Sequence, residues 1–191
     1  GPAFLQGFAD PALDLTARYI LVAPSGVGNS WNIVNEQEED PQDDVGFVGT
    51  TLVAHLATYG NVQPVFKLIG HSNGAALTNR ILIENDDARI THAVTDVSQL
   101  NSFQYQATPP PGGLFIGGAN NDYATRKTTF TKRYVLQCTG ALDAVIPAFG
   151  GPSLIDGKNG QKVAYPTWNT SAYAYAQAYG YTGAAAVAPV D

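Results

Sequence analysis

The chain has 191 residues, of which 45% are hydrophobic and 14% are charged, a composition typical of one globular domain rather than of a disordered segment. Its 16 acidic residues outnumber its 10 lysines and arginines, and the net charge of −6 argues against nucleic-acid binding, which needs a basic surface. A single cysteine, Cys138, excludes an intrachain disulfide and a cysteine-rich zinc site. No apolar run is long enough to predict a membrane span, and the first residues lack the layout of a signal peptide.

The first half of the chain predicts strand, helix, strand and helix in that order. Residues 19–23 form an apolar run that ends at a Pro-Ser-Gly turn, and residues 65–69 form another run. From Asp44 onward, apolar residues fall on one face of a helix that Asp43 or Asp44 caps and that stops near Gly60. These apolar residues are Val45, Val48, Leu52, Val53 and Leu56.

The second half of the chain continues the alternation of helices and strands. The expected segments are a helix over residues 73–83, strands over residues 90–97, 114–116 and 134–136, and a last helix over residues 171–179. Short apolar runs that alternate with helical patterns are typical of parallel βαβ units. The sequence therefore predicts one α/β domain with a parallel sheet over residues 1–191.

Gly70-His71-Ser72-Asn73-Gly74 is the strongest local signal in the chain. A Gly-x-Ser-x-Gly motif directly after an apolar strand and directly before a helix is the context of a nucleophilic serine. The glycines allow the strand and the helix to approach each other, and the helix N-terminus directs free N–H groups at a developing oxyanion. We therefore predict Ser72 as the nucleophile of a serine hydrolase of the α/β-hydrolase type, with the Asn73 N–H as an oxyanion-hole donor.

A serine nucleophile needs a base, and the base needs an acid that orients it. Asp143 follows the strand predicted over residues 134–136, where α/β-hydrolases carry that acid, although an ordinary turn residue also fits this position. The catalytic histidine of such enzymes follows the acid, but no histidine occurs here beyond His92. His55 is expected on a helix surface, His71 is expected to point away from the serine, and His92 is expected within or at the end of a strand.

Four segments carry a family resemblance. They are Asn29-Ser30-Trp31-Asn32, Asp43-Asp44-Val45-Gly46-Phe47, the Ser72 turn, and the stretch from Asp143 to Gly151. In this order they resemble the polyhydroxybutyrate depolymerase and feruloyl esterase group of α/β-hydrolases. The resemblance implies a parallel-sheet α/β-hydrolase core and a serine carboxylesterase acting on polymeric or aryl esters, with Ser72 as nucleophile and Asp143 as acid. It also implies that Trp31, Phe149 and Trp168 bind the substrate.

The chain departs from that family at three places. The strand that normally supplies the second oxyanion-hole donor has no counterpart before Tyr19, and Thr139 stands where the family has a non-catalytic histidine. The catalytic histidine after Asp143 is missing as well. These departures predict a shortened hydrolase core. Its alternative roles are a catalytically impaired or non-catalytic interaction domain, or a fragment completed by another chain.

Neither a cofactor nor a metal ion is expected. The acidic residues 36–44 predict a solvated loop rather than a calcium site, because the ligand spacing of an EF-hand loop is absent. No glycine-rich phosphate loop occurs, which argues against a nucleotide-binding α/β domain. A shortened sheet leaves unpaired strand edges, so association between copies of the chain is expected. The cellular compartment stays open, and the family resemblance is compatible with secretion.

Overall fold

The computed structural model describes residues 18–33, 42–60, 63–108, 112–117, 122–156 and 162–185. Contacts within the chain divide it into two units, residues 1–30 and residues 31–191. The described part of the first unit contains the short 3₁₀ turn η1 (Val27–Asn29) and no strand. The strand predicted over residues 19–23 is therefore wrong. The run is partly exposed and belongs to none of the described sheets. A strand needs a neighbouring strand as hydrogen-bond partner, and this run has none in those sheets.

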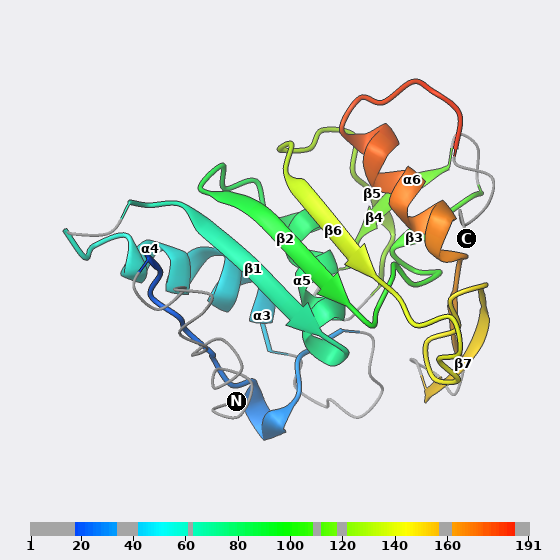
Figure 1. Ribbon diagram of the computed structural model, residues 1–191, viewed down its shortest axis with the longest axis horizontal. Coiled ribbons are helices and arrows are strands. Elements are labelled where there is room, and N and C mark those ends of the chain that lie inside the picture. Colours follow the sequence, from blue (N-terminus) through cyan, green and yellow to red (C-terminus); the bar gives the residue numbers. More distant parts are fainter. Residues whose placement is uncertain are drawn as a thin grey trace. The chain divides into compact units, whose positions relative to one another are not determined.

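The second unit contains a three-stranded parallel sheet (Figure 1). Its strands are β1 (Phe66–His71), β2 (Ile90–Asp96) and β6 (Tyr134–Cys138), in the spatial order β1-β2-β6. Apolar runs predict all three strands, and their parallel pairing confirms the mixed α/β class. Helix α5 (Asn73–Glu84) connects β1 to β2 and contacts both strands. Its buried side chains include Ala76, Leu77 and Ile81, which belong to the core.

A helical segment with one apolar face comes before β1, as the sequence predicts. It consists of α3 (Asp44–Gly46), the π-helical turn η2 (Phe47–Leu52) and α4 (Val53–Leu56), and so it ends before Gly60. The Asp43 side chain caps it by accepting a hydrogen bond of 2.8 Å from the Gly46 N–H. Three residues of the predicted apolar face are buried in the core, namely Val45, Val48 and Val53.

Small antiparallel sheets and a last helix complete the second unit. These elements are β3 (Tyr105–Gln106), β4 (Gly113–Ile116), β5 (Thr125–Arg126), β7 (Gly151–Asp156), β8 (Lys162–Tyr165) and α6 (Trp168–Ala178). Residues 114–116 form a strand as predicted, but it pairs antiparallel with β3 and β5 and lies outside the parallel sheet. Among the described helices, none is long and apolar enough to cross a membrane.

A buried ion pair on α5 connects this helix to two loops. Arg80 donates hydrogen bonds to the Glu84 carboxylate (2.8 and 3.1 Å), to the Asn32 carbonyl (2.6 Å) and to the Gly117 carbonyl (3.1 Å). Burial by itself disfavours the charged guanidinium, but the hydrogen bond and the charge of Glu84 outweigh this effect and raise the pKa of Arg80. The Asn32 N–H also donates to Asp44 (2.6 Å). The loop at Asn32 is therefore held from two helices.

Replacing Arg80 with methionine leaves the largely buried Glu84 carboxylate without its cation. We expect the free energy of unfolding to fall by about 3–5 kcal/mol. The double variant Arg80→Met, Glu84→Gln is expected to recover part of this loss, because no unpaired charge remains. Urea unfolding followed by circular dichroism measures both effects. A loss below about 1 kcal/mol in the single variant would contradict the expectation, because that is the range of an exposed pair.

Candidate functional site

Ser72 lies at the turn between β1 and α5 with φ 52° and ψ −118°. A residue with a side chain rarely adopts a positive φ, and such a conformation costs about 1–3 kcal/mol. Neighbouring backbone groups hold it in place. The Ser72 N–H donates to the Asp96 carbonyl (2.9 Å), and the Ser72 carbonyl accepts from the N–H groups of Ala75 (2.9 Å) and Ala76 (3.1 Å). The turn thus has the strained geometry that the Gly-x-Ser-x-Gly motif predicts.

Gly70 permits the close approach of β1 to α5. A Cβ atom at this position would lie 2.2 Å from the Gly74 carbonyl oxygen and 2.5 Å from the Thr78 hydroxyl, far inside van der Waals contact. At Gly74 the situation differs, because a Cβ would approach nothing closer than the Trp31 indole nitrogen at 3.8 Å. The prediction that both glycines are needed for this approach is therefore correct for Gly70 and wrong for Gly74.

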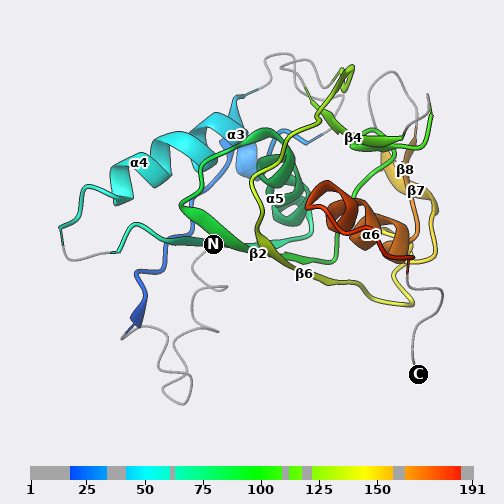
Figure 2. The same cartoon turned by 90° about the horizontal axis from the view of Figure 1, so that it is seen from above.

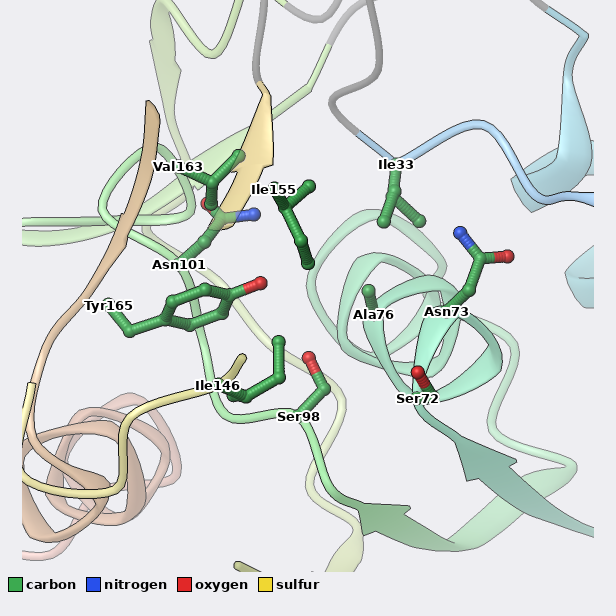
Figure 3. Close-up of a pocket in the computed structure, with 10 residues that line it drawn as sticks. All are labelled: Ile33, Ser72, Asn73, Ala76, Ser98, Asn101, Ile146, Ile155, Val163 and Tyr165. Carbon is green, nitrogen blue, oxygen red and sulfur yellow. The ribbon is translucent and has the colours of Figure 1, made fainter. Parts of the chain in front are cut away.

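A pocket of about 110 Å³ lies beside the serine turn (Figure 3). Its wall is half apolar, and Figure 3 shows the hydroxyls of Ser72, Ser98 and Tyr165 directed into the same space. The lining residues come from the serine turn and α5, from the segment after β2, from β7 and β8, and from two loops. They are Ile33, Ser72, Asn73, Ala76, Ser98, Asn101, Ile146, Ile155, Val163 and Tyr165.

Asn73 lines this pocket and also anchors the loop at Trp31. Its side-chain oxygen accepts a hydrogen bond from the Trp31 N–H (2.8 Å), and its amide nitrogen donates to the Trp31 carbonyl (3.3 Å). The Asn73 N–H belongs to the first turn of α5, where backbone N–H groups have no acceptor within the helix and carry partial positive charge. Asn73 is therefore the first residue of α5, and the role of its N–H as an oxyanion-hole donor stays a prediction.

Asp143, the predicted catalytic acid, stabilises a turn. Its Oδ1 atom accepts hydrogen bonds from the N–H groups of Val145 (2.8 Å) and Ile146 (2.8 Å). These are the contacts of an ordinary turn residue, the alternative role considered for this position. Asp143 does not line the pocket, but Ile146, which it holds, does.

Tyr165 is a polar residue of the pocket that the sequence does not single out. Burial raises the pKa of its phenol to about 12, and the nearby Asp143 charge adds to this shift, while a hydrogen bond with Ser98 opposes it. At neutral pH the Tyr165 hydroxyl is therefore protonated and able to donate a hydrogen bond. Ser98 follows the carboxyl end of β2, where functional residues of an α/β sheet gather. This position is the one feature of the sequence that could have indicated Ser98 as a site residue.

The three histidines of the chain all lie in described ranges, and none lines the pocket. His55 is exposed on α4, which confirms its predicted position on a helix surface, and it contacts the Tyr59 ring edge-on. His92 lies near the amino end of β2 and stacks on Tyr134 with ring centroids 4.8 Å apart. The His71 side chain is exposed, and its Nδ1 atom lies 2.8 Å from an Asp96 carboxylate oxygen.

None of the three predicted substrate-binding aromatics is among the residues that line the Ser72 pocket. Phe149 and Trp168 line a second, more open hollow of about 310 Å³, together with Gln137, Thr139, Ala141 and Ala148. Trp31 packs against the core beside α5. Within the described ranges, no group of three or more acidic, histidine or cysteine side chains is arranged to hold a metal ion. Residues 36–41 of the acidic loop lie outside the described residues.

Comparisons with models of protein families, with curated proteins and with solved structures found no match to this chain. The resemblance to the depolymerase and feruloyl esterase group therefore stays a prediction that rests on the four segments and on the geometry of the Ser72 turn.

Alanine substitutions at Gly70 and Gly74 test which of the two glycines the packing of β1 against α5 requires. Gly70→Ala forces a Cβ against the backbone of α5, and we expect a loss of about 1–3 kcal/mol or more in the free energy of unfolding. Gly74→Ala has room and replaces a glycine within a helix, so it is expected to leave stability unchanged or to raise it by up to about 1 kcal/mol. Thermal and urea unfolding measure both variants, and equal losses would contradict the observed packing.

Proposed function

We propose that this chain is a carboxylic-ester hydrolase with an α/β-hydrolase core that forms an acyl-enzyme on Ser72. The observation that carries the proposal is the strained conformation of Ser72 between β1 and α5, with its hydroxyl directed into a pocket. A structural serine at this turn gains nothing from a positive φ, whereas a nucleophile needs an exposed hydroxyl beside free helix N–H groups.

In the proposed reaction, the residues that line the pocket have different roles. The Ser72 Oγ atom attacks the acyl carbonyl carbon, its proton passes to a base, and the carbonyl oxygen becomes an oxyanion beside the Asn73 N–H. The bond to the alcohol oxygen then breaks, the alcohol takes up a proton, and water hydrolyses the acyl-serine. Ile146, Ile155 and Val163 surround the acyl group. A cavity of about 110 Å³ is only a few water volumes, so it accepts an acyl chain of a few carbons.

Among the described residues that line the pocket, none supplies the base of this mechanism. None of the three histidines lines it, and the Tyr165 phenol, with a pKa of about 12, is too weakly acidic to be present as a phenolate base at neutral pH. We propose that the proton acceptor comes from outside the pocket, from a partner chain or from solvent. Hydrolases that lose one triad member retain roughly 10³–10⁴-fold catalysis over water. We therefore expect slow turnover with activated esters.

The same lack of a histidine favours a second proposal, a non-catalytic interaction domain that retains the hydrolase turn. The two proposals differ in whether Ser72 accepts an acyl group.

Mixing the chain with p-nitrophenyl acetate tests the acyl-enzyme. We expect a burst of p-nitrophenol that approaches one equivalent per chain, with the acetyl group found on the Ser72 peptide by mass spectrometry, and no burst from Ser72→Ala. Added imidazole supplies a base and is expected to accelerate the Ser72-dependent part of the reaction. Identical traces from both proteins, with and without imidazole, would exclude the hydrolase proposal and support the interaction domain.

The size of the pocket predicts the acyl-chain preference. We expect p-nitrophenyl acetate and butyrate to acylate Ser72 at least about tenfold faster than the octanoate, because each excess methylene has no space. Val163→Ala removes two methyl groups from the wall and is expected to narrow this ratio, while Leu154→Ala, on the exposed side of β7, serves as the control. A ratio that does not change in Val163→Ala would show that the acyl group binds elsewhere.

A further inference from the structure

One face of the parallel sheet carries none of the helices that the structure describes in the second unit. Helix α5 contacts β1 and β2 from one side, and Figure 2 shows the labelled helices on that side of β2 and β6. On the opposite face lie exposed apolar side chains, Ile69 (47% exposed), Tyr134 (74%) and Leu136 (59%). Parallel sheets are found almost only with both faces covered. We therefore expect another protein surface to cover this face.

The register of the strands arranges this face in three rows. Alternate residues of a strand point to the same side, and paired residues on neighbouring strands lie next to each other. The rows, from the amino ends to the carboxyl ends of the strands, are Lys67-His92-Tyr134, Ile69-Val94-Leu136 and His71-Asp96-Cys138. The first row carries the cation Lys67, the middle row is apolar, and the third row carries the carboxylate of Asp96.

We propose that a second copy of this chain packs against this face, with the strands of the two sheets running in opposite directions. A two-fold axis along the middle row brings the apolar rows of the two copies together, at the spacing of about 10 Å that packed sheets adopt. The same rotation keeps each strand opposite its own counterpart, so Asp96 of the other copy faces His92 and lies one strand away from Lys67. If the strands ran in the same direction, like rows would meet and Asp96 would lie two rows away from Lys67.

The proposed interface leaves the Ser72 pocket open. Residues 70 and 72 face α5 and the pocket, whereas His71 lies on the opposite face of the sheet, where its ring contacts Asp96. The interface is independent of the proposed hydrolase activity. It comprises nine side chains per copy, fewer than the roughly 20–30 residues a side of a standard interface, so we expect an affinity in the micromolar range.

Sedimentation velocity of the full chain over a wide concentration range tests the proposal. We expect a reversible monomer–dimer equilibrium. Leu136→Lys places a charge in the apolar row and is expected to raise the dissociation constant about tenfold or more. Leu142→Lys makes the same change at a leucine that is 98% exposed and lies outside the face, and it is expected to leave the equilibrium unchanged.

A second variant shows whether a weaker dimer results from the loss of the interface or from a disturbed fold. Lys67→Glu alters an exposed side chain at the rim of the face, should preserve the circular dichroism spectrum and the unfolding midpoint, and is expected to weaken the dimer severalfold. A chain that remains monomeric at every concentration overturns the proposal, as does equal dimerisation of Leu136→Lys and Leu142→Lys. A dimer that Leu136→Lys and Lys67→Glu leave unchanged places the contact on another surface and overturns it as well.

Discussion

The close packing of β1 against α5 is the constraint on which the candidate site depends. Gly70 leaves no space between the strand and the Gly74 carbonyl, so the chain must reverse within the serine turn, and Ser72 takes the strained conformation. The strain of about 1–3 kcal/mol is offset by the hydrogen bond that the Ser72 N–H donates to β2, by those that the Ser72 carbonyl accepts from α5, and by the burial of most of α5. Val97, with a φ of 60°, is also strained and lies directly after β2, next to Ser98. Both irregular residues thus lie where two strands reach the pocket.

Buried polar contacts explain why several residues of the resembling segments occur in this chain. Asn73 binds both backbone groups of Trp31, while Asp44 and Arg80 bind the N–H and the carbonyl of Asn32. Each of these side chains satisfies a buried or half-buried backbone group that would otherwise cost about 1–3 kcal/mol. These contacts therefore position Ile33 at the pocket and give the polar residues a structural role in this chain.

The two faces of the parallel sheet serve different purposes in these proposals. The face toward α5 carries the core and leads to the Ser72 pocket, whose apolar residues and hydroxyls would surround the carbonyl in the proposed reaction. The other face carries His71 and Asp96 beside an apolar row, and its polarity changes along the strands. His71 adjoins Ser72 in sequence, but the two-residue alternation of a strand directs its side chain to the other face.

The sequence by itself determined the elements whose signals are local. Apolar runs and one-sided helical spacing predict β1, β2, β6 and α5, and the five-residue motif predicts the turn at Ser72, because strand, turn and helix propensities act over a few neighbouring residues. The missing strand at residues 19–23 shows the limit of this approach, since an apolar run becomes a strand only where a neighbour supplies hydrogen bonds. Only the tertiary structure decided that Ser98 and Tyr165 share a pocket with Ser72, because the pocket joins residues that are far apart in the chain and have no common periodicity.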